Sequence, residues 1–176
     1  LWVIADAAQG FGGAIGDRKV GRFAPLTTTS FFPAKPLGCY GDGGAVFTED
    51  AGLAALMRSL RMHGQGTDRY DNVRIGMNAR LDTLQAAVLL AKLEVFEQEI
   101  GQRQRVAAVY AELLGRTVAV PEVAAGNVSA WAQYTIRTAQ RDALAERLRR
   151  AGVPSAIHYR KPLHRQPAFA GCPVAD

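Results

Sequence analysis

A single lysine in an apolar, proline-braced turn constrains this chain more than any other feature. Residues 27–38 read Thr-Thr-Thr-Ser-Phe-Phe-Pro-Ala-Lys-Pro-Leu-Gly, and residues 40–45 add a glycine cluster just after Lys35. The chain uses only four lysines against seventeen arginines. A lysine amine can become a nucleophile and form a Schiff base, which arginine cannot do. The turn therefore favours covalent chemistry with a carbonyl cofactor. The alternative is a lysine whose stem packs on aromatic rings while its head reaches water.

Length and composition indicate a soluble globular chain. A length of 176 residues fits one domain, or one domain with part of a second. No apolar run approaches the roughly eighteen residues that span a bilayer. The chain begins inside an apolar run without an initiating methionine, so we expect an internal piece of a longer protein. Cys39 and Cys172 have neither a disulfide framework nor a metal-ligand spacing, which favours a reduced, cytoplasmic protein.

The basic charge balance permits an anionic partner. The formal net charge is +5 and the pI is about 9.6. The arginines are not clustered with aromatic residues, so nucleic acid is unsupported as the partner. A phosphorylated small molecule is an anionic partner that the same positive charge would attract.

Short apolar and β-branched runs predict a sheet in the first 50 residues. Leu1–Ala5 reads as a strand buried on both faces of a parallel or mixed sheet. Asp6 then lies at its carboxyl end, where open α/β sheets bind ligands. Gly10–Gly16 lacks the dinucleotide-binding pattern and predicts a glycine-rich hairpin. Thr27–Phe31 and Ala45–Thr48 predict two further strands.

A capped amphipathic helix follows this sheet. Asp50 is the expected N-cap, and a glycine at Gly64 ends the helix. Its apolar face consists of Leu53, Leu56, Met57 and Leu60. The polar, glycine-bearing residues 65–77 predict a loop.

A second, longer helix is expected to begin at Asp82. Gln85, three positions later, completes a capping-box pattern. The helix is predicted to run to near Leu114, with a break around Gly101. The apolar band at residues 86–91 is wide, so we expect both sides of this helix to be covered.

A connection at residues 115–126 is the predicted domain boundary, which divides the chain into domains 1–115 and 116–176. The second domain is expected to be a small α+β domain. Its predicted elements are a strand at Trp131–Arg137, a helix capped by Thr138 and ended at Gly152, and a strand at Ala156–Tyr159.

Four polar residues form a candidate cofactor site. A pyridine-ring cofactor requires a carboxylate at its ring nitrogen, a lysine for its aldehyde and donors for its phosphate. Asp6 and Lys35 match the first two requirements, Ser30 matches part of the third, and Gln9 can donate to the ring hydroxyl. Asp–Lys pairs are common, so structural roles stay open for each residue at this point.

The same residues stand in motifs that resemble the DegT/DnrJ/StrS family of sugar aminotransferases, which depend on pyridoxal 5'-phosphate. The matching motifs are Asp6-Ala-Ala-Gln9, Ser30-Phe-Phe-Pro-Ala-Lys35-Pro-Leu-Gly, Gly41-Asp-Gly-Gly-Ala and Gly76-Met-Asn78-Ala-Arg80-Leu-Asp. The resemblance implies an α/β fold of the aspartate-aminotransferase type. It assigns the chain to part of the large mixed-sheet domain and part of the small carboxyl-terminal α+β domain.

The resemblance also implies a role for each site residue. Asp6 would bind the pyridine nitrogen, Gln9 the phenolic oxygen and Ser30 the phosphate, while Lys35 would hold the cofactor covalently. Asn78 would reach the cofactor phosphate of the neighbouring subunit in a homodimer with shared active sites. The amino-terminal half of the family's fold is absent, so this piece alone should bind cofactor poorly and be inactive.

Other motifs indicate a branch of the family. Ile157-His158-Tyr159 followed by Pro162-Leu163-His164 resembles the members that aminate a UDP-linked 2-acetamido-2-deoxy-3-oxo-glucuronate for lipopolysaccharide O-antigen, with glutamate as donor. In those members His158, Tyr159 and Arg80 would lie near the sugar. A dTDP-linked 3-oxo-6-deoxyhexose and a non-catalytic role remain the alternatives. No metal is expected.

Overall fold

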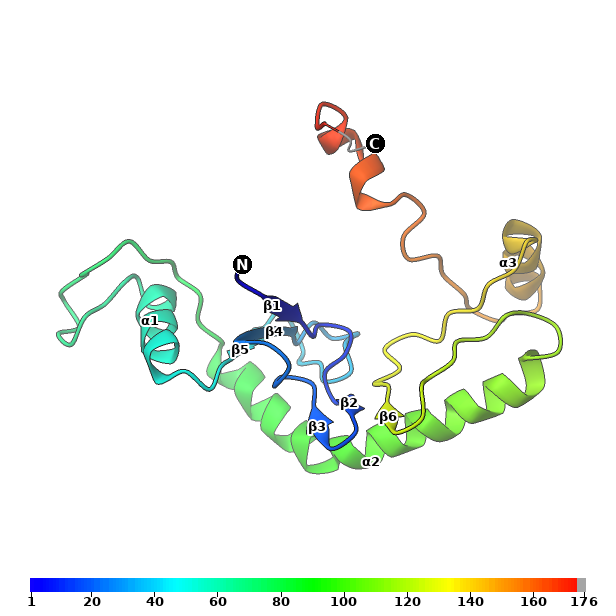
Figure 1. Cartoon of the computed structure of the whole chain (residues 1–176), viewed down its shortest axis with the longest axis horizontal. Coiled ribbons are helices and arrows are strands. Elements are labelled where there is room, and N and C mark those ends of the chain that lie inside the picture. The colour runs from blue at the N-terminus through cyan, green and yellow to red at the C-terminus, as the bar shows by residue number, and fades with distance from the viewer. Residues whose placement is uncertain (174–176) are drawn as a thin grey trace. The chain divides into compact units, whose positions relative to one another are not determined.

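The computed structural model describes residues 1–173, which form two compact units, Leu1–Ile136 and a second unit from Arg137 onward (Figure 1). The first unit contains β1 (Ile4–Asp6), β2 (Ala14–Ile15), β3 (Arg18–Lys19), β4 (Leu26–Ser30), β5 (Gly44–Phe47), α1 (Ala51–Arg61), α2 (Thr83–Leu114) and β6 (Asn127–Val128). The second contains α3 (Arg141–Arg150) and two 3-10 turns, η1 (Leu163–Arg165) and η2 (Pro167–Phe169). The domain boundary expected at residues 115–126 concerns the complete protein and stays a prediction.

A three-stranded mixed sheet organises the first unit. Its order is β1-β4-β5, with β1 parallel to β4 and β5 antiparallel to β4. The β-branched residues of β4 alternate, because Thr27 and Thr29 are buried while Thr28 and Ser30 are only half-buried. Side chains alternate between the two faces of a strand, so the sheet has one covered face and one open face.

The covered face packs on α2 through aromatic rings. Phe11 stacks against Phe47 of β5 and against Phe96 of α2, with ring centroids 5.7 Å apart in both pairs. Leu37 and Leu89 belong to the same buried cluster. The core of this unit therefore lies between the covered face and one side of α2.

The expected burial of the first strand is wrong in the described residues. β1 forms as predicted, but Trp2 is 81% exposed and Ile4 is 60% exposed. Among residues 1–173, β1 pairs only with β4, and Ile4 on the open face stays largely exposed.

The glycine-rich segment forms the predicted hairpin. β2 and β3 pair antiparallel around a turn at Gly16 and Asp17, and Gly16 has a φ of 58° that favours glycine. β6 pairs with the other edge of β2, which gives a second sheet of order β3-β2-β6.

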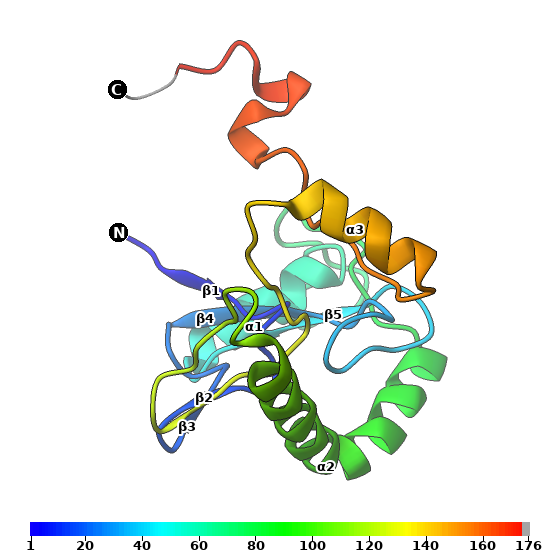
Figure 2. The same ribbon diagram turned by 90° about the vertical axis from the view of Figure 1, so that its right-hand side faces the viewer.

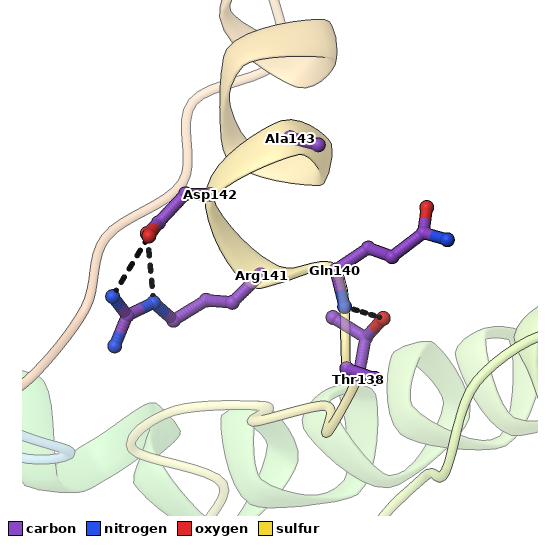
Figure 3. A pocket seen from close by; sticks show the side chains of 6 residues that line it. Thr138, Gln140, Arg141, Asp142 and Ala143 are labelled. Atoms are coloured by element: carbon purple, nitrogen blue, oxygen red, sulfur yellow. Dashed lines mark hydrogen bonds and ion pairs between the residues drawn. The ribbon is translucent and has the colours of Figure 1, made fainter.

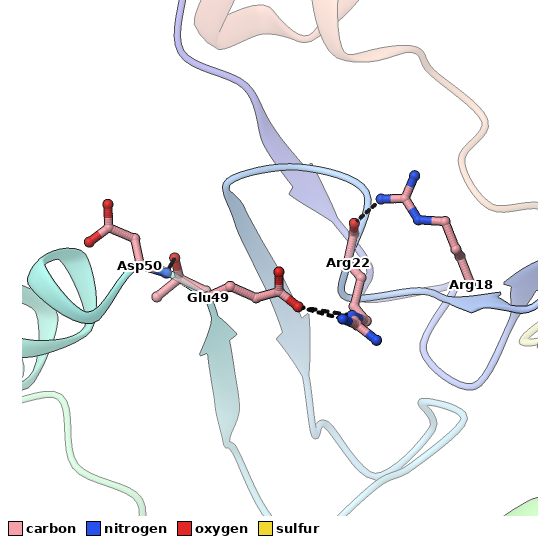
Figure 4. A network of polar contacts seen from close by, with 5 residues as sticks. Arg18, Arg22, Glu49 and Asp50 are labelled. Carbon is pink, nitrogen blue, oxygen red and sulfur yellow. Dashed lines mark hydrogen bonds and ion pairs between the residues drawn. The ribbon is translucent and has the colours of Figure 1, made fainter.

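The first helix begins and ends as predicted. The Asp50 carboxylate accepts a hydrogen bond from the Leu53 N–H at 2.9 Å, which caps α1. Immediately before the cap, Glu49 accepts hydrogen bonds of 2.7 and 3.0 Å from Arg22 (Figure 4). Gly64 follows the helix with a φ of 78°. Residues 65–77 form the expected loop.

The long helix α2 differs from the prediction in three ways. It is one continuous helix through Gly101, without the predicted break, although its ribbon bends part-way along (Figure 2). Asp82 is its N-cap but makes no capping hydrogen bond, and Gln85 instead accepts from the backbone N–H of Tyr40. Only one stripe of the helix is buried, so its predicted coverage on both sides is wrong in the described residues. That stripe holds Leu89, Phe96, Ile100 and Ala107, whereas Leu84, Leu90, Val106 and Leu113 are exposed.

The segment after β6 packs along α2 by side-chain contacts. The strand predicted at Trp131–Arg137 does not form, because Trp131 has a φ of 45° and its polar groups bond to helix side chains. Its indole N–H donates to Gln104 at 2.9 Å, and its carbonyl oxygen accepts from Arg103 at 3.1 Å. Tyr134 packs beside it, with ring centroids 5.3 Å apart.

The second unit contains the predicted helix but not the predicted strand. The N-cap of α3 is Gln140 rather than Thr138, whose hydroxyl accepts from the Gln140 N–H at 3.1 Å. Gly152, with a φ of 72°, follows the helix as expected. Ala156–Tyr159 is not a strand, because a strand needs a hydrogen-bonded partner and the described part of this unit contains none.

Candidate functional site

Three polar side chains share the open face of the mixed sheet. Asp6 pairs with Thr28 in the parallel register of β1 and β4, so the two side chains stand on the same face. Ser30 lies two residues after Thr28 and therefore points the same way. A carboxylate and two hydroxyls thus line the carboxyl-terminal edge of two parallel strands, where open α/β sheets bind their ligands.

Hydrogen bonds fix the turn that follows Asp6. The Ala7 N–H donates to the Thr28 carbonyl at 2.7 Å, and the Thr29 hydroxyl donates to the Ala7 carbonyl at 3.3 Å. The Asp6 carboxylate accepts from the Ala8 N–H at 2.9 Å. Asp6 itself is exposed and forms no ion pair among residues 1–173, so its second carboxylate oxygen is available to a ligand.

Lys35 lies in a loop that leaves and re-enters the sheet at this edge. The Phe31 N–H donates to the Gly43 carbonyl at 2.8 Å, which extends the pairing of β4 with β5 by one residue. Residues 32–42 form the loop beyond that pair. Inside it, the Lys35 N–H donates to the Phe32 carbonyl at 2.9 Å, and Lys35 is half-buried. Asp6, Ser30 and Lys35 therefore come from one sheet edge.

One side of the Lys35 loop packs into the buried core. Phe31, Leu37 and Cys39 belong to the core cluster, and Cys39 has no exposed surface. A Cβ on Gly38 would lie 2.5 Å from the Pro33 carbonyl oxygen, so the chain passes there only as glycine. On the other side the loop is open, since Phe32 is 50% exposed. The apolar enclosure of the lysine expected from the sequence is one-sided in the described residues.

The glycines after the loop serve packing. A Cβ on Gly43 would lie 2.9 Å from a Leu81 side-chain carbon, and one on Gly44 would lie 2.8 Å from the Thr29 carbonyl oxygen. These contacts are with the protein itself, as the absence of a following Gly-Lys-Ser/Thr pattern indicates.

Gln9 lies in the turn after β1 with an exposed side chain, three residues beyond Asp6. That side chain forms no hydrogen bond with the described residues. Its assignment to the ring oxygen therefore rests on the resemblance.

Asn78 and Arg80 form a second polar group. The Arg80 guanidinium donates to the Asn78 side-chain oxygen at 3.0 Å, and both residues are exposed. Backbone bonds from Met77 to Leu60 and from Ala79 to Arg61 hold this segment against the end of α1. No hydrogen bond of the described residues joins it to the Asp6–Lys35 edge.

His158 and Tyr159 belong to the second unit. Both are exposed, and their rings meet edge-on with centroids 5.7 Å apart. Their predicted contact with the sugar stays a prediction.

A pocket of about 500 Å³ opens at the start of α3 (Figure 3). The residues that line it form one consecutive segment, Thr138 to Ala143, and include none of the predicted site residues. Within it, the Arg141 guanidinium bonds to Asp142 and lowers the pKa of that carboxyl. The pocket is therefore a surface feature of one short segment.

The donor set at the sheet edge fits a pyridoxal cofactor. An available carboxylate suits a protonated ring nitrogen, the Ser30 hydroxyl suits a phosphate oxygen, and Lys35 supplies the amine. Thr28 is a further candidate for the cofactor site, and its position in the sequence alone did not reveal it. The signal that reveals it is the parallel register, which places its hydroxyl beside Asp6 on the open face.

No helix among residues 1–173 combines the length and apolar character needed to cross a membrane.

Comparisons with known proteins give a consistent match. A family model described as the DegT/DnrJ/EryC1/StrS aminotransferase family matches residues 1–174. UDP-2-acetamido-2-deoxy-3-oxo-D-glucuronate aminotransferase of Pseudomonas aeruginosa is 50% identical, over 99% of this chain and 50% of its own length. A dTDP-3-amino-3,4,6-trideoxy-alpha-D-glucose transaminase of Streptomyces venezuelae is 38% identical, over 97% of this chain and 45% of its own length.

The solved structures agree with the sequence matches. The crystal structure of a DegT DnrJ EryC1 StrS aminotransferase from Brucella abortus superposes with a TM-score of 0.94 and 56% identity. The match covers 96% of this chain and 45% of that one. The chain thus spans about half the length of the curated relatives it matches.

Proposed function

This chain belongs to the DegT/DnrJ/EryC1/StrS aminotransferase family, and we propose that the complete protein is a pyridoxal-phosphate-dependent sugar aminotransferase. The fold is the α/β fold of these enzymes. The observation that supports the proposal is that Asp6, Ser30 and the loop that carries Lys35 lie at one edge of the mixed sheet. The reaction moves an amino group from an amino acid, glutamate, to the 3-keto group of a nucleotide-linked sugar.

Each of these residues would contribute to the reaction in its own way. When bound, pyridoxal phosphate would supply an electron sink for the amino-acid donor. Asp6 would accept the hydrogen bond of the ring N–H, and Ser30 would donate to a phosphate oxygen. Gln9 would donate to the ring's phenolic oxygen. The Lys35 amine would hold the cofactor and would act as the base and acid that moves a proton at the donor carbon.

The substrate we propose is UDP-2-acetamido-2-deoxy-3-oxo-glucuronate, the substrate in the name of the Pseudomonas relative. In this proposal the Arg80 guanidinium binds the sugar carboxylate, and the His158 and Tyr159 side chains contact the sugar. The charge distribution supports an anionic ligand. From Arg137 to the end, the sequence carries eight Lys and Arg against three Asp and Glu, so the whole net charge of +5 lies in that part.

We further propose a cytoplasmic homodimer in which Asn78 reaches the cofactor phosphate of the partner subunit. The exposed position of Asn78, outside the Asp6–Lys35 edge, supports a role across an interface. Cys39 and Cys172 are free thiols, which suits a reducing compartment. The product serves cell-surface polysaccharide synthesis, lipopolysaccharide O-antigen in particular.

The decisive experiment locates the cofactor on the complete protein. Borohydride reduction followed by peptide mass mapping should place the cofactor mass on Lys35, and Lys35→Ala should lose the visible absorbance band. Lys19→Ala is the matched control, because Lys19 is exposed and, among residues 1–173, forms an ion pair only with Glu97. Retention of the band in Lys35→Ala protein would refute the proposal.

A second candidate substrate is a dTDP-linked 3-oxo-6-deoxyhexose, which the name of the Streptomyces relative favours. That sugar has no carboxylate. Arg80→Gln should therefore slow turnover of the UDP-linked glucuronate roughly 10- to 100-fold, the worth of one charge-assisted hydrogen bond. The same substitution should leave the turnover of the dTDP-linked sugar unchanged. Faster turnover of the dTDP-linked sugar by the unaltered protein would favour the second candidate.

A further inference from the structure

Two half-buried polar side chains lie on the same side of α2 as its buried stripe. Gln85 and Lys92 continue, at a helical spacing, the line of the buried Leu89, Phe96 and Ile100. The three apolar members belong to the core cluster that also contains Leu37 and Cys39 of the Lys35 loop. Polar residues on such a stripe are costly unless they form hydrogen bonds.

Both polar side chains bond to the backbone of the Lys35 loop. Gln85 accepts from the Tyr40 N–H at 2.8 Å, and the Lys92 ammonium donates to the Gly38 carbonyl at 2.5 Å. Between these two points lies Cys39, whose N–H donates to the Phe31 carbonyl at 2.8 Å. Three consecutive loop residues are therefore tied, two to α2 and one to the end of β4.

These ties act close to the reactive amine. Gly38 follows Lys35 by three residues, and a Cβ on Gly38 would lie 2.7 Å from the Phe32 carbonyl oxygen. The same Phe32 carbonyl accepts the Lys35 N–H. A shift of Gly38 away from Lys92 would therefore displace the backbone turn that carries the Lys35 side chain.

We infer that Gln85 and Lys92 are positioning residues, which clasp residues 38–40 to α2 and so set the place of the Lys35 amine at the cofactor. The inference rests on the proposed function. Neither residue touches the reacting atoms. Each acts through a backbone group of the loop, the Tyr40 N–H and the Gly38 carbonyl. The clasp also links the loop to the Asn78–Arg80 segment, because α2 begins at Thr83, three residues after Arg80.

The test uses the complete protein loaded with pyridoxal phosphate. Gln85→Met and Lys92→Met remove the two ties, whereas Gln85→Glu keeps an acceptor and Lys92→Arg keeps a cationic donor. Gln98→Met is the control, since Gln98 lies exposed on the same helix. Cofactor affinity is measured by titrating the apoprotein, and the pH midpoint of the cofactor's visible band is measured on the loaded protein.

The two methionine variants should weaken cofactor binding about tenfold, equivalent to about 1.4 kcal/mol. They should also shift the pH midpoint of the band and lower kcat with little change in the KM for the sugar. The conservative variants should restore all three quantities, and Gln98→Met should change none. Should Lys92→Met not fold, Lys92→Leu replaces it with the same expectations, because leucine also lacks a hydrogen-bond donor.

Lower thermal stability with an unchanged pH midpoint and unchanged cofactor affinity would overturn the inference, because a merely structural residue behaves that way. Failure of the proposed function is distinguishable. In that case the unaltered protein itself would bind no cofactor. If instead the unaltered protein shows the visible band, and the methionine variants match it in cofactor affinity and pH midpoint, only the positioning role of Gln85 and Lys92 is overturned.

Discussion

Asp6 in β1 lies directly opposite Thr28 in β4, and both side chains stand on the open face of the sheet. Parallel pairing sets this relationship, because one residue of slippage would turn Asp6 to the covered face. The backbone bond from Ala7 to the Thr28 carbonyl continues the pairing beyond the strand end and holds the register. The direction of the candidate catalytic carboxylate is thus a property of the sheet.

Replacing Asp6 by Asn in the complete protein should lower kcat roughly 10- to 100-fold, because a charge-assisted hydrogen bond to the ring becomes a neutral one. Steady-state kinetics and cofactor titration measure the effect. Asp17→Asn is the control, since Asp17 is exposed in the turn between β2 and β3. Equal kinetics for the two variants would contradict the role assigned to Asp6.

Two glycine-to-alanine changes should have opposite effects on the free energy of unfolding. Gly38→Ala places a methyl group against two backbone oxygens and should destabilise the protein by about 1–3 kcal/mol. Gly101→Ala lies in open space within α2 and should stabilise it by up to about 1 kcal/mol. Denaturant unfolding of both variants checks the signs, and a stabilising Gly38→Ala would show that the loop passes elsewhere.

Replacing either of the two buried threonines of β4 by valine should change stability in different ways. Thr27 is fully buried, and its hydroxyl has no hydrogen-bond partner among residues 1–173. Thr27→Val removes that orphan group and should be neutral or stabilising by about 1 kcal/mol. Thr29→Val removes the hydrogen bond to Ala7 and should cost about 1 kcal/mol. Thermal unfolding ranks them, and a costly Thr27→Val would mean that its hydroxyl has a partner.

Acid should weaken the ion pairs of α3. Side-chain hydrogen bonds from Arg149 and Arg150 hold the pKa of the Glu146 carboxyl below its ordinary value of 4.5. Because the folded pKa is the lower one, the stabilising contribution is present above pH 4.5 and is lost as the pH falls through the folded pKa.

An NMR titration of the Glu146 carboxyl carbon measures this shift. Changing Arg149 and Arg150 together to Gln should return the midpoint toward 4.5. Arg147→Gln is the matched control, because Arg147 forms no ion pair in the described part of the chain. An unmoved midpoint in the double variant would show that other groups cause the shift.

Elements with local signals were predictable from the sequence. The β-branched run of β4, the Asp50 cap and the Gly64 stop each act within a few residues of their own position. The hairpin at Gly16 follows the same rule. The place of Asp6 and Ser30 at the ends of two parallel strands was also predictable, whereas their roles toward a cofactor stay predictions.

Features that depend on distant partners were not predictable. The expected capping box does not form, because Gln85 instead accepts a hydrogen bond from the N–H of Tyr40, 45 positions away in the sequence. Trp131–Arg137 alternates like a strand but bonds to α2 through Gln104. Thr28 was missed since only the register of β1 against β4 reveals its neighbour.

The open face has a consequence for the electrostatic attraction that Asp6 can exert on a ligand. Ile4 is 60% exposed and Val46 is 49% exposed on the face that bears Asp6. Between opposite charges, the attraction in bulk water is about a quarter of that at a typical protein surface site. The attraction that the proposed site exerts on a protonated ring nitrogen would therefore grow if Ile4 and Val46 were covered and solvent were excluded. In the proposed site Asp6 supplies the charge, and the strength of its attraction to a ligand depends on how dry the open face becomes.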